Sequence, residues 1–450
     1  MLTAADNEIL CRVGPGTAMG NLLRQYWIPA LISDELPAPD GPPMRLRLLG
    51  ENLIAFRATS GKVGIIANSC PHRGASLFFG RNEEDGLRCV YHGWKFDTSG
   101  ACIDMPSEPA ESNFKSKVRA ISYPTQERNS IVWCYMGPRS TPPPLPDHPG
   151  NTSPNVRVGK FVRACNFMQA LEGDIDTIHA GFLHSGHVRP QDTAPGSVDY
   201  YAVKQRSARF EVQEHDIGAT YGSIRPADDP GMNVWRIGHF LLPFFTMNAP
   251  GVLSRRAGGN AYVPIDDEHV MGWRIIVQYP QEEYGKPGIG GLYEGQRTGN
   301  AVRRWQGWNQ MLPDTTDWIG KFRFVQNASN DYLIDREAQK KKEMTYTGIF
   351  GGPDPEDRAV QVSMGGIYDR TREHLATTDA MITRTRRKLI GAAKALRDHG
   401  TVPPGVDNPQ LYRMYSGGAI VPRDVSAIDF CRDMLFGRDA PAIEVTTGGS

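Results

Sequence analysis

The sequence predicts an α+β protein in which a small all-β domain precedes a larger domain of mixed helices and strands. Short apolar runs separated by turns fill the first third of the chain, which is typical of a small β domain. Six prolines within residues 137–150 indicate an extended connector. The chain has 450 residues, which is long enough for two or three domains with their own cores.

The net charge is zero, because the sequence contains 50 Lys and Arg residues and 50 Asp and Glu residues. No overall field favours nucleic acid or an anionic membrane, so neither is an expected partner. The apolar run 237–245 is interrupted by glycine, histidine and proline and is too short to span a bilayer. Seven cysteines and no visible secretory signal indicate a reducing compartment, so a cytoplasmic location is expected.

Local patterns predict the individual elements. Residues 1–43 look like a separate N-terminal arm, with a short helix over residues 21–27. Strands are predicted over residues 45–49, 53–57, 63–67, 87–91 and 131–135 and, after the connector, over 233–247 and 269–279. A helix is predicted over residues 380–399, with Thr378 or Asp379 as its N-cap and Gly400 as its C-terminal glycine.

Two Cys-His pairs lie on predicted loops of the β domain. Cys70 and His72 form the first pair, and Cys89 and His92 form the second. Thiolates and imidazoles suit zinc or an iron–sulfur cluster and are poor ligands for magnesium or calcium. The four side chains predict a metal centre if the two loops are neighbours.

A zinc site that joins the two loops is the alternative interpretation of this cluster. However, a single residue separates Cys70 from His72, which is closer than the usual zinc spacing. Gly74 and Gly93 follow the two pairs and let backbone amides approach the sulfur atoms. These features favour an iron–sulfur cluster.

A second set of polar residues follows the connector, within an apolar pattern of helical spacing over residues 166–186. Glu172, Asp176 and His179 share one face of the predicted helix, and buried acids need a partner or a cation. His179 and His184 are about 140° apart on an ideal helix, so both reach one metal only if the helix ends or bulges near Gly181. A solvated acidic face with two unrelated histidines is the alternative. Two histidines and a distant carboxylate would form a facial triad for Fe(II).

The pattern Cys-x-His-x16-Cys-x2-His followed by Asp-x2-His-x4-His resembles the Rieske non-haem iron oxygenases along essentially the whole chain. The catalytic subunit of phthalate dioxygenase-type enzymes is the most similar. Further matching segments are NEILCRVGPGTAMGNLLRQYW, CVYHGWKFD, DYLIDREAQ (331–339) and QVSMGGIYDRTREHL (361–375). The resemblance implies an arm over residues 1–43 that packs with the catalytic domain, a Rieske [2Fe–2S] domain over 44–140, and a helix-grip catalytic domain with mononuclear Fe(II) over 151–450.

The resemblance also implies ligands for the cluster. Cys70 and Cys89 would bind one iron, and His72 and His92 would bind the other.

For the mononuclear iron, the resemblance implies that His179 and His184 are ligands. Asp176 would bridge His179 and, across a subunit contact, a Rieske histidine of the next chain, expected to be His92.

The third iron ligand is expected to be a distant carboxylate, and GGPDPEDRAVQ offers Asp354, Glu356 and Asp357. Asp357 is favoured because it begins the apparent helix DRAVQ and matches the position of the ligand in the family. Relatives with an asparagine directly after the conserved glutamate differ from this chain, which has Gly173 there.

The resemblance implies oxygenation of an aromatic, carboxylated substrate by O2, with electrons from an NAD(P)H-dependent flavin/iron–sulfur reductase. That reductase would be a separate protein, because no G-x-G-x-x-G follows a predicted strand. An arginine would bind the substrate carboxylate; the candidates are Arg225, Arg236, Arg255 and Arg256. The subfamily implies a homotrimer or stacked trimers. A monooxygenase that carries out O-demethylation or ether cleavage, and a Rieske electron carrier, are the alternatives.

Overall fold

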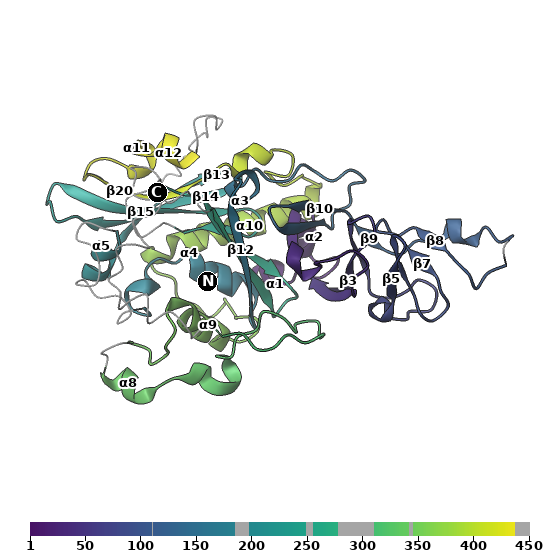
Figure 1. The fold of residues 1–450 in the computed structure, drawn as a ribbon. Coiled ribbons are helices and arrows are strands. Elements are labelled where there is room, and N and C mark those ends of the chain that lie inside the picture. Colours follow the sequence, from purple (N-terminus) through teal and green to yellow (C-terminus); the bar gives the residue numbers. More distant parts are fainter. Residues whose placement is uncertain (110, 185–197, 249–254, 278–309, 342–344, 437–450) are drawn as a thin grey trace.

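The computed structural model describes residues 1–109, 111–184, 198–248, 255–277, 310–341 and 345–436. A small N-terminal β domain extends from one end of a larger α+β domain, so the molecule is elongated (Figure 1). Among the helices in these ranges, none combines the length and the apolar character that a membrane span needs.

The N-terminal β domain contains two four-stranded antiparallel sheets, ordered β2-β3-β4-β9 and β5-β6-β7-β8. Their strands are β2 (Met44–Leu48), β3 (Glu51–Arg57), β4 (Val63–Ala67), β5 (Arg81–Glu83), β6 (Gly86–Arg88), β7 (Lys95–Phe96), β8 (Cys102–Asp104) and β9 (Ser122–Tyr123). The strand predicted over residues 87–91 is too long, because the backbone turns after Arg88. The Gly93 amide donates to the Cys89 carbonyl at 2.9 Å and closes that turn.

The N-terminal arm contacts both parts of the molecule. Its helices α1 (Ala4–Cys11) and α2 (Ala18–Arg24) pack against α10 (Ala380–His399) of the larger domain. Strand β1 (Trp27–Ile32) joins a third sheet, β1-β11-β10, with β10 (Thr125–Arg128) and β11 (Ile131–Tyr135). The helix predicted over residues 21–27 is displaced, because the Thr17 hydroxyl caps the helix earlier by accepting from the Gly20 amide.

The larger domain is built on a nine-stranded antiparallel sheet. Seven strands follow the order β12-β19-β18-β16-β15-β14-β13; β20 also pairs with β15, and β17 pairs with β20. Its strands are β12 (Val156–Arg163), β13 (Arg209–His215), β14 (Gly218–Pro226), β15 (Met232–Leu241), β16 (Phe245–Met247), β17 (Arg255–Arg256), β18 (Gly258–Pro264), β19 (Val270–Val277) and β20 (Ser416–Pro422). The single strand predicted over residues 233–247 is therefore two strands, which turn at Pro243. Proline has no amide hydrogen for the ladder and interrupts the pairing there.

Helices cover this sheet. The longest, α10, has the predicted bounds and ends at Gly400, whose φ of 66° is left-handed. Asp379 is at its N-cap position, but its carboxylate accepts from the Ala376 amide and does not cap the helix. The other helices are α3 (Pro149–Thr152), α4 (Phe167–Ile175), α5 (Val198–Lys204), α8 (Arg336–Lys341), α9 (Pro353–Ser363), α11 (Ala427–Phe430) and α12 (Arg432–Phe436).

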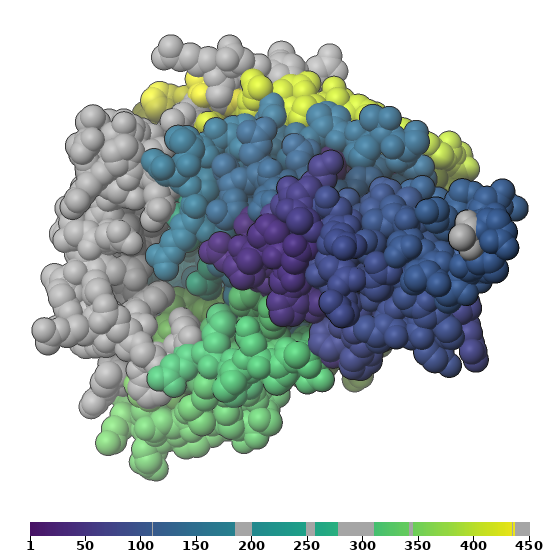
Figure 2. All heavy atoms as spheres, turned by 45° about the vertical axis from the view of Figure 1, so that its right-hand side comes forward, coloured from purple at the N-terminus to yellow at the C-terminus, as the bar shows by residue number. Residues whose placement is uncertain are grey.

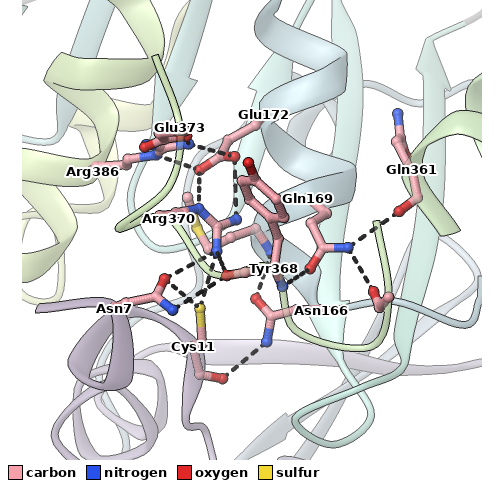
Figure 3. A network of polar contacts seen from close by, with 12 residues as sticks. Asn7, Cys11, Asn166, Gln169, Glu172, Gln361, Tyr368, Arg370, Glu373 and Arg386 are labelled. Atoms are coloured by element: carbon pink, nitrogen blue, oxygen red, sulfur yellow. Dashed lines mark hydrogen bonds and ion pairs between the residues drawn. The ribbon is translucent and has the colours of Figure 1, made fainter. Parts of the chain in front are cut away.

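Buried charges join the arm, α4 and α10 (Figure 3). Glu172 of α4 accepts from Nε and Nη2 of Arg370 at 3.3 and 3.2 Å, and from Nε and Nη2 of Arg386 at 2.7 and 3.0 Å. Arg370, which is fully buried, also donates from Nη1 to Asn7 Oδ1 at 3.3 Å and contacts Cys11 Sγ at 3.2 Å. One carboxylate thus holds three separate segments together.

Burial by itself raises the pKa of Glu172, but the guanidinium groups of Arg370 and Arg386 hold that pKa below its ordinary value. The ionised carboxylate is therefore the stabilising form. Because the folded pKa lies below the unfolded value of about 4.3, this contribution is fully present above that value and is lost as the pH falls through the folded pKa.

We expect Glu172→Gln to lower the free energy of unfolding by about 3–5 kcal/mol at pH 7, because two buried guanidinium groups lose their partner. Asp6→Asn is the matched control, since the Asp6–Lys394 ion pair also joins α1 to α10 but is partly exposed, and should cost less than about 1 kcal/mol. Urea unfolding measures both. The difference between wild type and Glu172→Gln should shrink below pH 4; a difference constant down to pH 3 would contradict this assignment.

Candidate metal centres

The two Cys-His pairs lie on two neighbouring loops of similar shape. The first loop follows β4 and the second follows β6. In each loop the glycine amide donates to the cysteine carbonyl four residues earlier at 2.9 Å, and both glycines have a left-handed φ, 76° at Gly74 and 77° at Gly93. A side chain would strain either position, so glycine is required to close both turns.

The loops bring the four predicted cluster ligands together. Cys70 and Cys89 are both 3% exposed in the core of the loop-bearing part of the domain. The imidazole rings of His72 and His92 lie with their centroids 4.5 Å apart. Burial raises the pKa of the Cys70 thiol to about 11, so a metal must replace its proton to bind it.

The distances between the donor atoms of these four residues distinguish a site for a two-iron cluster from a site for a single zinc ion. Donor atoms on one zinc lie at most about 4.6 Å apart, twice the longest bond. In the described ranges, the only group of three or more potential ligands with all donor atoms within 4.8 Å is His179, His184 and Asp357. The four loop side chains are therefore too widely spaced for one ion, which fits a larger group.

His72 provides a second test of that fit. Its ring stacks on the Trp94 indole, with centroids 4.2 Å apart and an angle of 10° between the planes. Its Nδ1 is buried and has no hydrogen-bond partner in the described part of the chain. Buried polar nitrogens are normally satisfied, so this atom is placed as a metal ligand would be.

The second centre begins where α4 ends. The helix predicted over residues 166–186 stops at Ile175, and Asp176 is extended, with φ −77° and ψ 109°. The Asp176 carboxylate accepts from the Ile178 amide at 2.8 Å and turns the chain into a 3-10 segment, His179–Gly181. The helix therefore ends before both histidines, and Gly181 is not the position that breaks it.

Three side chains from two segments converge on one point. His179 Nε2 lies 3.3 Å and His184 Nε2 lies 3.4 Å from the same oxygen, Oδ1 of Asp357. The two rings are nearly perpendicular, at 81°, with centroids 5.2 Å apart. Two imidazoles and one carboxylate are the donor set of a non-haem Fe(II) site with open positions.

A carboxylate also contacts the other nitrogen of each imidazole. Asp176 Oδ2 lies 3.4 Å from His179 Nδ1, and Glu356 Oε2 lies 2.8 Å from His184 Nδ1. Glu356 is fully buried and accepts from the Thr347 hydroxyl at 2.5 Å. Such contacts fix the ring orientation and leave Nε2 as the donor toward a metal.

The three acids considered for the third ligand have different surroundings. Asp357 faces the histidines, and Glu356 contacts the far side of one of them. Asp354 instead forms ion pairs with three arginines, with Arg163 and Arg274 at 3.0 Å and Arg358 at 3.5 Å. Helix α9, which carries all three acids, begins at Pro353 and not at Asp357 as the sequence suggested.

The electrostatics of the site favour a cation. Burial by itself lowers the pKa of His179, but contacts with Asp176 and Asp357 raise it to about 10. Burial by itself raises the pKa of Asp357, but the two imidazoles lower it well below its ordinary value. The site therefore stabilises positive charge beside an ionised carboxylate.

A cavity of about 500 Å³ opens beside this site. Asp176, His179 and Asp357 lie in its wall, together with residues of α9 and of the segment 364–375. The side chain of Asp176 is about one quarter exposed. The Asp176 carboxylate is thus accessible from the cavity while it contacts His179, a predicted iron ligand.

On the other side of α4, Asp174 holds a polar cluster that the sequence did not indicate. Its carboxylate accepts from the Thr246 hydroxyl, from Asn248 Nδ2 at 2.5 Å and from Asn260 Nδ2 at 2.9 Å. These contacts attach the end of α4 to the sheet. The one sequence feature that could have indicated these contacts is that Asp174 is a third acid within the apolar pattern, between Glu172 and Asp176.

Two of the four candidate arginines lie side by side on the sheet. Arg225 of β14 is 3% exposed, and burial together with Arg236 of β15 lowers its pKa to about 10. Burial raises the pKa of Tyr221 of β14. Asp174 and Asp176 raise this pKa further, whereas Arg236 opposes the shift. Residues 221 and 225 share a strand face, so the arginines lie on the face toward the end of α4.

The other two candidates, Arg255 and Arg256, form β17 against β20. Their side chains lie outside the described part of the structure.

Two families match the chain. The Rieske [2Fe–2S] domain matches residues 26–123, and the family described as LigXa C-terminal domain like matches residues 134–432. The chain is 41% identical to the 3-chlorobenzoate-3,4-dioxygenase oxygenase subunit of Comamonas testosteroni over 94% of this chain and 96% of that one. It is 34% identical to the phthalate 4,5-dioxygenase oxygenase subunit of Pseudomonas putida over 96% and 95% of the two chains. It is 35% identical to the 5,5'-dehydrodivanillate O-demethylase oxygenase subunit of Sphingobium sp. (strain NBRC 103272 / SYK-6) over 92% and 84%.

Solved structures share the fold at low sequence identity. Dicamba monooxygenase bound to 3,6-dichlorosalicylic acid is 18% identical, with a TM-score of 0.51 over 84% of this chain and 99% of that one. Pseudomonas putida CBB5 NdmA with caffeine is 16% identical, with a TM-score of 0.53 over 91% and 100%. The family match over residues 134–432 and the relatives of 34–41% identity show that this chain belongs to the Rieske non-haem iron oxygenases, as an oxygenase subunit that uses a [2Fe–2S] cluster and a mononuclear iron.

Proposed function

We propose that this subunit oxygenates an aromatic carboxylate, using O2 and electrons from a separate NAD(P)H-linked reductase. The observation that carries the proposal is the convergence of His179 Nε2, His184 Nε2 and Asp357 Oδ1 on one point. Two relatives that match almost the whole chain are named for aromatic acids, chlorobenzoate and phthalate. O-demethylation is the second candidate reaction, because a relative of 35% identity is named as a demethylase subunit.

Seven side chains would hold the two metal groups. When bound, the mononuclear iron activates dioxygen and the cluster supplies electrons one at a time. The protein ligands of the iron would be His179, His184 and Asp357, and those of the cluster would be Cys70, His72, Cys89 and His92.

The protein's own groups would position these ligands. Asp176 and Glu356 would each accept a hydrogen bond from the Nδ1–H group of one histidine and thereby hold its ring and its tautomer. Glu356 is locked in turn by the hydroxyl of Thr347. Rings held in this way keep both Nε2 atoms directed at the point that Asp357 faces.

We propose that Asp176 also accepts from His92 of a neighbouring copy, in a homotrimer or stacked trimers. The cavity beside Asp176 would receive the tips of the two Cys-His loops of that copy. Val90 and Tyr91, which lie between Cys89 and His92, are 59% and 57% exposed, so the tip carries an apolar surface suited to such a contact.

Arg225 and Arg236 would bind the substrate carboxylate. Two neighbouring guanidinium groups on the sheet face toward the end of α4 concentrate positive charge there. A carboxylate placed there relieves their mutual repulsion and accepts charge-assisted hydrogen bonds.

The purified holoenzyme should contain about three irons and two labile sulfides per chain. We expect Asp357→Ala or His179→Ala to remove one iron and all product formation while the visible spectrum of the cluster remains. Ser363→Ala, at an exposed position of the same helix, is the control and should keep three irons. Metal analysis and absorption spectra measure these outcomes. A wild-type content of two irons would instead identify an electron carrier, and turnover by His179→Ala would reject the assigned ligand.

Asp176→Asn should leave the iron content and the cluster spectrum unchanged, because Asp176 does not bind metal. It should slow oxidation of the cluster by substrate and O2 in a single turnover about 10- to 100-fold, as is usual when a ligand's hydrogen-bond partner is lost. Stopped-flow absorbance of the reduced cluster measures this rate. An unchanged rate would show that the carboxylate has no part in connecting the two centres.

A screen of benzoates, phthalates and methoxybenzoates with a surrogate reductase tests the substrate class, scored as product formed per O2 consumed.

Arg236→Gln should lower kcat/KM for the best acid about ten- to a hundredfold, because a charge-assisted hydrogen bond is lost. The loss should be much smaller for the corresponding amide. Arg128→Gln, an exposed arginine of β10, is the matched control. Equal losses for acid and amide would rule out Arg236 as the carboxylate anchor.

A further inference from the structure

A second cavity, of about 410 Å³, lies between the N-terminal β domain and the larger domain. One wall is formed by the arm and β2, and the other by β12, β18, β19 and residues 315–322. In Figure 2 the purple and blue surface of the N-terminal third meets the green surface of residues 310–341. No predicted ligand of either metal centre lines it. The cavity is therefore separate from the oxygenase site.

The inner lining of this cavity is largely apolar. Trp273 forms part of its floor and is fully buried. Further apolar lining residues from both walls are Met44, Leu46, Val263, Ile265, Met271 and Phe322. A space of this size and character accommodates a small organic molecule.

The polar groups at the cavity are mainly cations. Lys160, 6% exposed, donates to Glu35 Oε1 at 2.5 Å and lies 4.8 Å from the ring centre of Trp273. Lys321 approaches the other oxygen of Glu35 at 3.8 Å. One carboxylate therefore serves two ammonium groups.

Arg45 lies at the edge where the two domains meet. Its guanidinium lies 3.8 Å from the ring centre of Phe78 and 5.5 Å from that of Trp318. Its Nη1 donates to the Thr316 carbonyl at 2.7 Å, across the crevice between the two domains that contains the cavity. Among the described residues it has no carboxylate partner, although Arg47 pairs with Asp266 and Arg57 with Glu127.

The cations around the cavity differ in their partners. Five cations line it: Arg45, Arg47, Arg57, Lys160 and Lys321. Four of them act with carboxylates, Arg47 with Asp266, Arg57 with Glu127, and both lysines with Glu35. Among the described residues Arg45 is the lining cation without such a partner, and it lies next to an apolar space. A ligand with one negative charge and an apolar body complements both features.

We propose that this cavity is a binding site for a small aromatic monocarboxylate, with its carboxylate against Arg45 and its ring over the apolar floor. The ring of such a ligand can lie over the floor that includes Trp273 while the carboxylate accepts from the Arg45 guanidinium nitrogens that do not donate to Thr316. Because the ligand contacts β2 on one side and residues 315–322 on the other, binding holds the two domains together at this crevice.

The test uses 4-azidobenzoate as a photolabel on the full-length holoenzyme, followed by peptide mass mapping. We expect saturable labelling of peptides that contain residues 37–48 and 315–322, at sites distinct from the oxygenase centre. Benzoate should compete, whereas benzylamine, of similar size but opposite charge, should not. The same labelling should persist in His179→Ala, which separates this site from the proposed function.

Arg45→Gln should reduce labelling of these peptides about tenfold at subsaturating probe, because the charge-assisted hydrogen bond is lost. Ala38→Trp, at an exposed position in the cavity wall, should block it sterically with little risk to folding. Arg128→Gln is the matched charge control and should label as wild type does. Absence of adducts in these two segments, equal competition by benzylamine, or full labelling of both cavity variants would overturn the proposal.

Discussion

The C-terminal domain depends on one geometric constraint: two imidazole nitrogens and one carboxylate oxygen must meet at a single point. His179 and His184 come from the chain directly after α4, whereas Asp357 comes from α9, more than 170 residues later. Donor atoms this close are costly in the absence of a cation, because their lone pairs and charges repel or must be shared with protons. The fold therefore has to hold both segments rigidly, and the buried contacts around them do so.

Those contacts form two layers. Asp176 and Glu356 fix the far nitrogens of the two histidines, and Glu356 is itself fixed by a threonine hydroxyl. Farther out, Glu172 anchors α4 to Arg370 and Arg386, and Arg370 reaches Asn7 and Cys11 of the first helix (Figure 3). The N-terminal arm thereby supports the helix from which the iron site begins, although the two are far apart in sequence.

The cluster-binding loops are built differently. Two similar turns, each closed by a glycine with left-handed φ, place their cysteines inside a small separate core and their histidines near its surface. The cluster end of the molecule extends away from the catalytic end of the same chain (Figure 1). This shape fits the proposal that electrons pass between neighbouring copies, and it leaves between the two domains the crevice in which the second cavity lies.

The sequence alone determined the local features of this protein. Cysteine and histidine spacing, a helix-ending glycine and the apolar runs predicted the α+β class, two sets of candidate metal ligands and α10 to the residue, because each depends on neighbours along the chain. The end of α4 at Ile175 was misjudged because the Asp176 carboxylate turns the chain there. The start of α9 was misjudged because Pro353 fits the first turn of a helix, where its missing amide hydrogen costs nothing. The resemblance already favoured Asp357 over Asp354 and Glu356. Only the tertiary structure showed that Asp357 faces both histidines, that Glu172 pairs with two arginines and that Arg225 lies beside Arg236. These outcomes depend on which side chains from distant segments share a buried space, and short sequence patterns carry no information about that.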